Sequence, residues 1–340
     1  MRIELPISKS IANRLLILQA IHGDGLMTVS CDMPDDVRIM SEAIRLLGER
    51  REARIDLGNC GTAMRFLTAY CAQLEGQTTI LDGVERMHHR PIGQLVDALR
   101  EIGADIEYLG EEGFPPLRIK GCILDKHRIV TINNPQSTQF VSALLLIGAN
   151  VQTDSTSPYI YITREVIKQY QLSPFSYHLS VEKDWSSAAF WYEYVALYGG
   201  EITLLGLSRD SLQGDKIVAD IFAHLGVRTT YTAEGVVISS SPLHPTPYTL
   251  HHDFSACPDL YPAIALTCER LGVELHATGV ESLPLKESDR LRAVREHRTD
   301  ADHRMAMALL IAGYEVDDTA CISKSYPNFI EHFRHINSLK

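Results

Sequence analysis

The feature of this sequence that most constrains the fold is an internal repeat of stretches that are apolar almost all round. Each stretch is rich in small residues and ends at or near a glycine. A helix that is hydrophobic on every side must be buried, and a glycine after it suits a left-handed helix end. The sequence therefore predicts six buried helices, at residues 11–21, 62–74, 140–147, 187–198, 260–271 and 305–312.

Six further segments have helical periodicity with one polar face. In one of them, Ile92, Leu95, Val96 and Leu99 follow the spacing of a single apolar face. Two of the segments run into alternating stretches with a glycine turn, at 104–120 and 227–239, which indicates strand pairs. The amphipathic helices are predicted at 35–47, 91–102, 164–171, 215–225, 287–296 and 327–336.

The repeating unit is then a buried helix, a strand, an amphipathic helix and a strand pair, used six times. A chain of 340 residues is long enough for two domains, which gives three units per domain. The predicted fold class is therefore α/β. The alternative is an unrelated succession of helices and strands, which would have to produce six units in register by accident.

Composition narrows the possible partners. A net charge of −11 argues against nucleic acid or an anionic membrane, because both reward a basic surface. The seven cysteines are scattered without a C-x-x-C pair, which is typical of free thiols in a reducing compartment. The first 25 residues lack the features of a signal peptide, and no stretch approaches the roughly 20 apolar residues of a membrane span. We expect a cytoplasmic protein.

The starts of the buried helices carry an unusual set of residues. Helix N-termini favour anions, so Lys or Arg in the first turn of a buried helix is costly unless an anion lies there too. This predicts a cleft into which several helices point, holding more than one phosphate or carboxylate. The alternative is that each cation pairs with a nearby Asp or Glu. The residues at these starts are Lys9, Ser10, Arg14, Asn59, Gly61, Thr62, Arg65, Ser137, Thr138, Gln139, Asp302, His303 and Arg304.

Two shorter segments also combine charges in a suggestive way. Lys286 and Arg290 are four residues apart, so on a helix they would share a face, with Glu287 beside them to shuttle protons. The alternative is an exposed helix with salt bridges. Lys324 precedes a predicted helix that begins at Pro327.

Several common motifs are absent from the sequence. There is no Walker A sequence, no G-x-G-x-x-G and no G-x-S-x-G, which weakens nucleotide-binding and acyl-hydrolase interpretations. The pairs His88-His89 and His251-His252 lack the spacing of a zinc motif and fit surface histidines better. We expect neither a metal nor a cofactor.

Taken together, six motifs resemble the 5-enolpyruvylshikimate-3-phosphate synthase family. The match runs in order from residue 1 to about 335, and the set is far more specific than any single motif. The motifs are SKSIANR at 8–14, GNCGTAMR at 58–65, RPI at 90–92, KESDR at 286–290, DHRMAM at 302–307 and SKSYP at 323–327.

The resemblance implies a two-domain inside-out α/β barrel of six βαβαββ units, three per domain, that closes on its substrates. The inserted domain, on the shikimate-phosphate side, would span residues 9–181. The second domain would combine residues 1–8 with 182–340. We expect a monomer that uses shikimate 3-phosphate and phosphoenolpyruvate, with no nucleic acid or membrane partner.

The reaction implied by the resemblance is addition followed by elimination. The 5-hydroxyl of shikimate 3-phosphate attacks C2 of phosphoenolpyruvate while C3 gains a proton, and the intermediate then loses phosphate and a methyl proton. Asp259 matches the residue that acts as base on the hydroxyl. Glu287 and Lys9 match the residues that exchange the methyl proton, and the division among the three is open.

The ligand sets are carried over position by position. Those for shikimate 3-phosphate are Lys9, Ser10, Arg14, Ser137, Thr138, Gln139, Thr156, Asp259, Ser282 and Lys286. Those for phosphoenolpyruvate are Lys9, Asn59, Gly61, Arg90, Gln139, Arg290, His303, Arg304 and Lys324.

The sequence departs from the family pattern at several points. Thr138 stands where serine is usual, Thr156 or the adjacent Ser157 fills another serine position, and Ser282 replaces an asparagine. Several dozen expected residues are missing near 298–301. Either a stretch of the natural protein is missing from the sequence or the natural chain is short here. We expect the former, because deletion of a strand pair would leave sheet edges unpaired.

Two rival functions remain at this point. The sister enzyme that acts on UDP-N-acetylglucosamine shares the fold but uses a loop cysteine and lacks the motifs at 8–14 and 302–307. A non-catalytic protein that binds shikimate phosphate is the other rival. Intact Lys9, Asp259, Glu287 and Lys324 argue against it.

Overall fold

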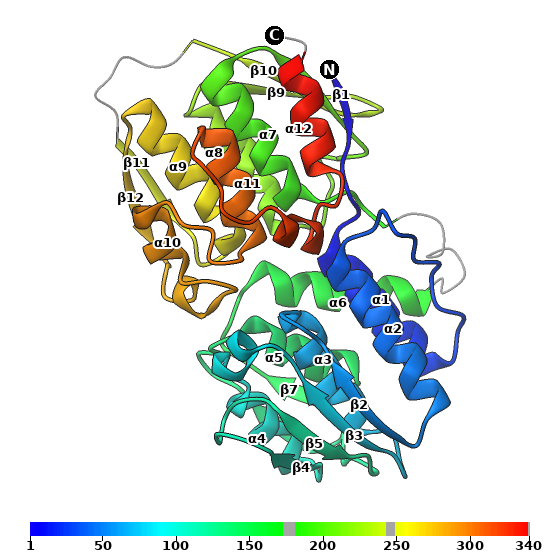
Figure 1. Ribbon diagram of the computed structural model, residues 1–340. Helices are drawn as coiled ribbons and strands as arrows, with labels where there is room; N and C mark the ends of the chain where they lie inside the picture. Colours follow the sequence, from blue (N-terminus) through cyan, green and yellow to red (C-terminus); the bar gives the residue numbers. More distant parts are fainter. Residues whose placement is uncertain (173–180, 243–248, 339–340) are drawn as a thin grey trace. The chain divides into compact units, whose positions relative to one another are not determined.

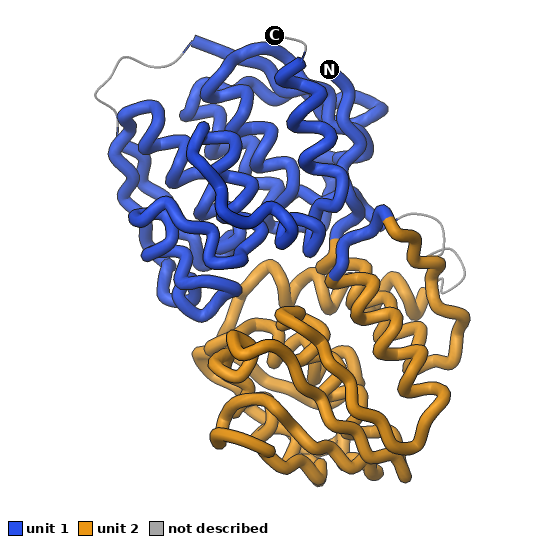
Figure 2. The backbone as a smooth tube through the Cα atoms, viewed as in Figure 1, with its two compact units in different colours: residues 1–8, 32–35, 181–340 blue, residues 9–31, 36–180 orange. Residues whose placement is uncertain are grey.

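The computed structural model of the protein describes residues 1–172, 181–242 and 249–338 (Figure 1). The chain divides into two compact units, coloured separately in Figure 2. Residues 9–31 and 36–180 form the inserted unit, and residues 1–8, 32–35 and 181–340 form the terminal unit.

The inserted unit contains a four-stranded sheet in the order β2-β3-β5-β4. The first pair is parallel and the others are antiparallel. A parallel pair, β6 with β7, forms a second small sheet. The strands are β2 (Glu52–Asp56), β3 (Thr78–Asp82), β4 (Asp105–Tyr108), β5 (Leu117–Lys120), β6 (Ile129–Thr131) and β7 (Asn150–Gln152).

The helices of the inserted unit are of the two predicted kinds. The buried helices α1, α3 and α5 contact one another, and each is enclosed over most of its length. The helices are α1 (Lys9–His22), α2 (Asp35–Glu49), α3 (Gly61–Ala72), the 3₁₀ helix η1 (Glu85–His89), α4 (Gly93–Glu101), α5 (Thr138–Leu146) and α6 (Pro158–Leu172).

The terminal unit is built in the same way. Its four-stranded sheet has the order β1-β8-β10-β9, and β1 from the N-terminus lies parallel to β8. The parallel pair β11 and β12 forms the second sheet. The strands are β1 (Arg2–Glu4), β8 (Glu201–Leu205), β9 (Val227–Tyr231), β10 (Gly235–Ser240), β11 (Thr249–Asp253) and β12 (Glu274–Thr278).

Three buried helices, α7, α9 and α11, contact one another at the centre of this unit. The helices and 3₁₀ turns (η) are α7 (Trp185–Tyr198), η3 (Gly214–Ile217), α8 (Val218–Ala223), η4 (Pro258–Leu260), α9 (Tyr261–Leu271), η5 (Leu283–Leu285), α10 (Arg290–Glu296), α11 (His303–Ala312), η6 (Ala320–Lys324) and α12 (Phe329–Ser338).

Each of the twelve predicted helices has a counterpart, with three corrections. The segment 215–225 divides into η3 and α8. The helix expected at 287–296 begins at Arg290, because Asp289 caps it by accepting a hydrogen bond from the backbone of Arg292 at 3.1 Å. The last helix begins at Phe329 rather than Pro327. The glycines that follow the six buried helices all have positive φ, as predicted.

The strand pairs follow the predicted repeat less completely. Within the described residues, an antiparallel pair follows the amphipathic helix in two places, at β4–β5 and β9–β10. The α/β class is confirmed, whereas the six-unit barrel is not.

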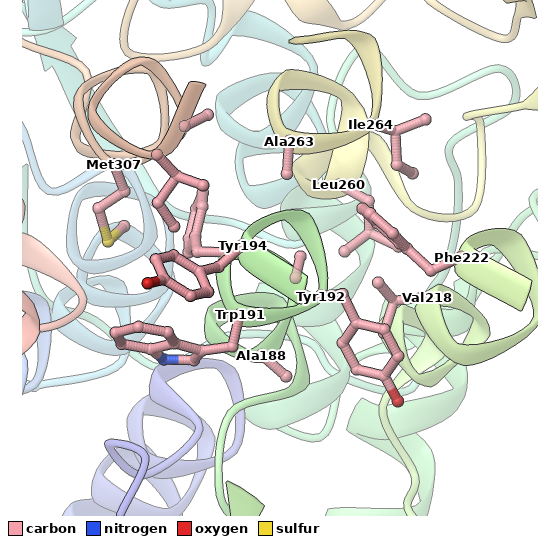
Figure 3. Packing of buried hydrophobic residues seen from close by; sticks show 14 of the residues in the cluster. Ala188, Trp191, Tyr192, Tyr194, Val218, Phe222, Leu260, Ala263, Ile264 and Met307 are labelled. Carbon is pink, nitrogen blue, oxygen red and sulfur yellow. The ribbon is translucent and has the colours of Figure 1, made fainter. Parts of the chain in front are cut away.

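The core of the terminal unit forms around α7 (Figure 3). Residues 185–195 of this helix are all buried, as its largely apolar sequence predicts. Trp191 donates a hydrogen bond to the Tyr326 hydroxyl at 3.2 Å and packs against Phe329 with 5.6 Å between ring centroids. The bulky aromatic side chains thus tie α7 to the C-terminal segment.

One residue of this core breaks the apolar rule. Glu193 is fully buried in α7, and neither carboxyl oxygen has a hydrogen-bond partner among the described residues. Burial raises its pKa well above the usual value for a glutamate. The folded protein therefore holds this proton at a pH where the unfolded chain has lost it, so stability declines as pH rises above about 4.3.

We expect Glu193→Met to stabilise the protein by about 1–3 kcal/mol at pH 8 and by less at pH 5, because it removes an unpaired buried carboxyl group. Thermal unfolding at the two pH values measures this. Glu201, exposed at the start of β8, provides a control in Glu201→Gln, which should change little. A destabilised Glu193→Met protein at pH 8 would contradict the expectation.

Candidate functional site

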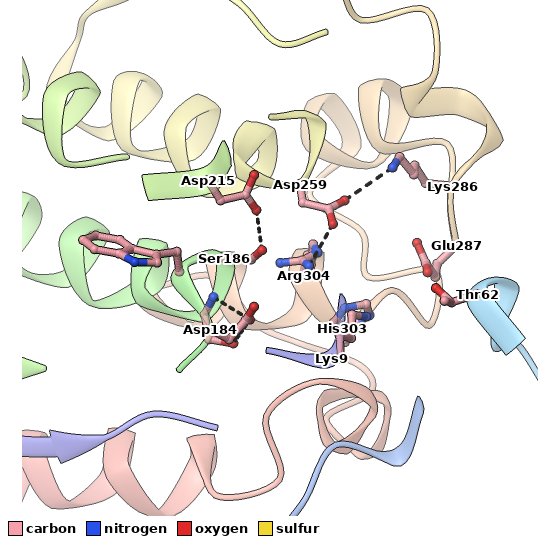
Figure 4. Close-up of polar contacts among 12 residues, drawn as sticks. Lys9, Thr62, Asp184, Ser186, Asp215, Asp259, Lys286, Glu287, His303 and Arg304 are labelled. Atoms are coloured by element: carbon pink, nitrogen blue, oxygen red, sulfur yellow. Dashed lines mark hydrogen bonds and ion pairs between the residues drawn. The ribbon is translucent and has the colours of Figure 1, made fainter. Parts of the chain in front are cut away.

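Three cations surround the carboxylate of Asp259 in the terminal unit, and Figure 4 labels two of them, Lys286 and Arg304. Asp259 lies in η4, directly before the buried helix α9. Arg290 Nη1 lies 2.8 Å from Oδ1, Arg304 Nη2 lies 2.9 Å from Oδ2, and Lys286 Nζ lies 3.5 Å from Oδ1. Burial favours the neutral acid, but the charges of Arg304, Lys286 and Arg290 prevail and hold the pKa of Asp259 well below its usual value. The carboxylate is therefore ionised.

Arg290 connects Asp259 to two further carboxylates. Its Nη2 lies 3.1 Å from Glu287 Oε2, and its Nε lies 2.8 Å from Asp302 Oδ2. The guanidinium is only 1% exposed. Asp259 and Glu287, the two residues predicted to move protons within this unit, are thus held by one planar group.

This geometry corrects the sequence-based picture of the 286–290 segment. Lys286 and Glu287 precede α10, so Lys286 and Arg290 do not share a helix face as expected. Both nevertheless reach Asp259, which lies on another element. The alternative of an exposed helix is also wrong for Arg290, which is buried.

Asp302 positions the cluster from the start of α11. Its Oδ1 accepts a hydrogen bond from the Arg304 backbone at 2.9 Å, which caps the helix. The Ser288 hydroxyl donates to Oδ2 at 3.2 Å. His303 is fully buried beside it, with Nδ1 3.7 Å from Asp302 Oδ1. The sequence placed Asp302 at the start of a buried helix and in a motif but gave it no separate role, although its place before an apolar helix is a capping signal.

Arg304 has two guanidinium nitrogens that could bind a ligand. Its side chain is 2% exposed, and among the described residues neither Nε nor Nη1 has a hydrogen-bond partner. Buried guanidinium N–H groups without acceptors are costly. An anionic ligand at these two donors would remove that cost.

The other residues predicted in the terminal unit lie on short turns. Ser282 precedes η5, and Lys324 ends η6; both are partly exposed. Next to Lys324, the Ser323 hydroxyl donates to the carboxylate of Asp35.

In the inserted unit, Lys9 and Arg14 both belong to α1. Lys9 Nζ lies 3.0 Å from Asp36 Oδ2. Arg14 is 2% exposed and donates to the Ser10 carbonyl at 2.6 Å and to the Thr163 hydroxyl at 2.7 Å. Burial lowers the pKa of Arg14 to about 10, while the charge of Tyr159 opposes this shift. Arg14 thus cross-links α1 and α6 in this structure.

The start of α5 carries Ser137, Thr138 and Gln139. The Ser137 hydroxyl caps the helix by accepting from the Gln139 backbone at 3.3 Å. The Gln139 amide donates to the Thr62 hydroxyl at 2.8 Å, so the N-terminal ends of α5 and α3 meet. Thr156 is exposed in the loop between β7 and α6.

Gly61 lies where two guanidinium groups approach the backbone. A Cβ atom at this position would lie 2.5 Å from Arg65 Nη1 and 2.6 Å from Arg90 Nη1. Arg90 Nη1 also lies 3.4 Å from the carbonyl oxygen of Asn59, its acceptor there. A side chain at this position would have to displace both guanidinium groups. Arg65, which donates from Nη2 to the Pro91 carbonyl at 3.1 Å, was not assigned a ligand from the sequence.

Sequence reasoning missed one part of the terminal-unit cluster. Asp184 caps α7 by accepting from the Ser187 backbone at 2.9 Å, and the Ser186 hydroxyl donates to Asp215. An aspartate directly before an apolar helix could have indicated Asp184. Nothing in the local pattern around Asp215 indicates a buried acid.

These clusters of buried cations and carboxylates fit a protein that handles small anionic substrates. The family profile for EPSP synthase (3-phosphoshikimate 1-carboxyvinyltransferase) matches residues 1–172, 146–297 and 295–333. The chain belongs to the EPSP synthase family. This confirms the predicted family and the prediction of an enzyme that transfers an enolpyruvyl group in the shikimate pathway.

Full-length relatives agree with the family profile. A 3-phosphoshikimate 1-carboxyvinyltransferase of Bacteroides fragilis is 38% identical over 394 residues, which cover 98% of this chain and 94% of that protein. One from Cellvibrio japonicus is 31% identical over 418 residues, covering 99% and 96%. Both alignments are longer than this chain, so the relatives carry segments that it lacks.

A solved structure supports the α/β fold. The EPSP synthase of Acinetobacter baumannii superposes with a TM-score of 0.67 at 20% identity, covering 97% of this chain and 94% of that one. None of the described helices is long and apolar enough to cross a membrane.

Proposed function

We propose that this enzyme transfers the enolpyruvyl group of phosphoenolpyruvate to the 5-hydroxyl of shikimate 3-phosphate and releases phosphate. The observation that carries the proposal is the Asp259 cluster. It joins an ionised carboxylate, a second carboxylate at Glu287 and three cations within one network. Such a network offers both groups that accept protons and groups that hold anions.

Asp259 is assigned the removal of the proton from the 5-hydroxyl. With three cations around it, Asp259 is ionised but weakly basic. Substrate phosphate or carboxylate groups that bind Arg304 and Lys286 would neutralise part of this charge and make Asp259 a stronger base. The cluster would therefore be most basic when substrates are bound.

Glu287 and Lys9 are assigned the methyl proton of the enolpyruvyl group. Glu287 is held by Arg290, whose Nη2 lies 3.1 Å from Oε2. Lys9 lies in the inserted unit, and its assignment to the methyl proton rests on the family resemblance. Because proton transfer needs groups within hydrogen-bond reach, each assignment predicts a large loss of rate on substitution.

The ligand sets predicted from the sequence become the proposed binding residues. The spare donors of Arg304 support its place among the phosphoenolpyruvate ligands. The approach of Arg90 to the Gly61 backbone supports that pair as well. Most donors of Arg14 bind protein groups, so contact with shikimate 3-phosphate would use the second hydrogen of Nη1 or would require these hydrogen bonds to rearrange.

The finer architecture is also part of the proposal. We propose the six-unit inside-out barrel and the functional domains 9–181 and 1–8 plus 182–340, in a cytoplasmic monomer. Support comes from the six pairs of buried and amphipathic helices and from the two compact units, whose boundaries differ from the predicted ones by a residue at 181 and by the short segment 32–35.

We retain the proposal that residues near 298–301 mark a missing stretch. The family profile matches this region in two overlapping segments, one that ends at residue 297 and one that begins at residue 295. Of the non-glycine residues described with positive φ, three lie here: His297, Asp300 and Ala301, with φ of 49°, 46° and 57°. Such backbone is strained, as expected of a connection that is too short. The mass of the intact natural protein tests this, and a mass equal to that of the 340 residues would refute it.

The activity itself is tested by phosphate release from the purified protein. Release that requires both phosphoenolpyruvate and shikimate 3-phosphate is the expected result. A folded protein that binds shikimate 3-phosphate but releases no phosphate would favour the non-catalytic alternative. Release with UDP-N-acetylglucosamine as acceptor would identify the sister activity instead.

Lys324→Ala should weaken phosphoenolpyruvate binding about tenfold or more, with a much smaller effect on shikimate 3-phosphate, because loss of a charge-assisted contact acts on one ligand. Isothermal calorimetry with each ligand measures the two affinities. Lys120→Ala, at an exposed position on β5, is the control. Equal weakening of both ligands would refute the division of the ligand sets.

A further inference from the structure

The carboxyl group of Asp215 is a buried acid that the proposed reaction does not use. It lies in η3 and is 4% exposed. The Ser186 hydroxyl donates to Oδ2, while Oδ1 has no hydrogen-bond partner among the residues described. Burial, reinforced by the charge of Asp259, raises the pKa of Asp215 to about 7. Figure 4 shows Asp215 close to Arg304 and Asp259.

Charged groups face Asp215 from several elements. Arg304 on α11 favours its ionised form, whereas Asp259 in η4 and Asp184 before α7 oppose it. Burial, together with the charge of Asp215, raises the pKa of the Cys257 thiol, which directly precedes η4. The surroundings thus contain two acids against one nearby cation, so a proton on Asp215 relieves repulsion.

Two other charged side chains come from the turn itself and from α8, which packs on it. Lys216 is exposed and donates to the Ser211 carbonyl at 2.8 Å, away from the carboxyl group. Asp220 on α8 is also exposed. Neither is among the groups that contribute most to the shift of the Asp215 pKa.

Arg304 provides the link to the substrate. Its Nη2 binds Asp259, but Nε and Nη1 have no hydrogen-bond partner in the described part of the chain. An ionised Asp215 attracts this guanidinium and repels an anion that approaches the open donors. A neutral Asp215 does neither, so the guanidinium is left for the ligand.

We propose that Asp215 is a positioning residue whose proton governs how strongly Arg304 binds phosphoenolpyruvate, so that binding of this substrate is coupled to proton uptake at Asp215. The inference rests on the proposed role of Arg304 as a phosphoenolpyruvate ligand. It assigns to Asp215 no contact with the reacting atoms.

The test compares the pH dependence of KM for phosphoenolpyruvate in the wild-type enzyme and in Asp215→Asn, from pH 6 to 9 at saturating shikimate 3-phosphate. In the wild type, KM should rise by up to tenfold per pH unit above the pKa of Asp215. In Asp215→Asn this rise should disappear, with kcat at pH 6 close to the wild-type value. Ionisation of the substrate is common to both proteins and cancels.

Proton uptake is measured directly by calorimetry in buffers of different ionisation enthalpy. At pH 8 the wild type should take up more protons than Asp215→Asn on binding phosphoenolpyruvate. Asp220→Asn, on the exposed face of α8, should match the wild type in both experiments. An unchanged pH profile or equal proton uptake in folded Asp215→Asn would overturn the proposal.

Two further variants keep the outcomes separate. If Asp215→Asn does not fold, Ser186→Ala takes its place: loss of the hydroxyl bond should move the midpoint of the KM profile to higher pH, and an unmoved midpoint overturns the proposal. Arg304→Lys tests the proposed function. If Arg304→Lys binds phosphoenolpyruvate as tightly as the wild type, the role of Arg304 is refuted. If Arg304→Lys binds it more weakly but the KM profile of Asp215→Asn equals that of the wild type, only the role of Asp215 is refuted.

Discussion

Arg290→Gln should be the most damaging single substitution in this enzyme. Arg290 binds Asp259, Glu287 and Asp302 at 2.8–3.1 Å and is almost completely buried. Its loss leaves three carboxylates with a missing partner, and removal of one side of a buried ion pair costs about 3–5 kcal/mol. We expect a marked fall in the thermal unfolding midpoint.

The same substitution should also reduce kcat/KM by about 10²–10³-fold in whatever protein remains folded. Arg290 orients both proposed proton-transfer residues and is itself a proposed phosphoenolpyruvate ligand. Activity is measured as phosphate release at a temperature well below the unfolding midpoint. The loss of activity is then separated from the loss of stability.

Arg292→Gln is the matched control for Arg290. Arg292 lies two residues along the same helix but is 52% exposed, with Asp300 at 3.1 Å and Glu296 at 3.8 Å. Surface ion pairs of this kind contribute little to stability because water and salt screen them, so stability and rate should change little. Similar effects from the two substitutions would show that the buried network has no special role.

Asp259→Asn should lower kcat by about 10²–10⁴-fold, the range expected when a general base is lost. Asparagine keeps the shape, and its one carbonyl oxygen can still accept a hydrogen bond from Arg290 or Arg304. Ligand affinities should therefore change far less than the rate. Phosphate-release kinetics and calorimetry with each substrate measure the two quantities.

Asp220→Asn is the control, since Asp220 is an exposed aspartate in the same unit. A folded Asp259→Asn enzyme that retains a tenth or more of the wild-type kcat would remove Asp259 from its assigned role. In that case Glu287 would become the leading candidate for the base.

Asp259 also contributes to the pH dependence of stability. Its pKa in the folded protein lies well below the unfolded value of about 3.9. The stabilisation is therefore complete above that unfolded value and is lost as pH falls through the folded pKa. Glu193 acts in the opposite direction, since its raised pKa weakens the fold as pH increases.

Much of the fold was readable from the sequence because burial leaves a periodic trace. A helix such as α7, enclosed by neighbours, must be apolar on every side, and this pattern shows in the sequence alone. The residues at the helix starts were found for a similar reason. Lys9 or Arg304 in the first turn of a buried helix conflicts with the local electrostatics and therefore stands out.

Tertiary structure alone decided which charges meet. Asp259 and Arg304 are 45 residues apart, and no local pattern predicts that they lie 2.9 Å apart. The burial of Glu193 and the place of Asp215 also depend on packing between distant segments. Periodicity in a sequence records how much of an element is buried, but it does not record its partners. The chemistry of this site depends on the partners.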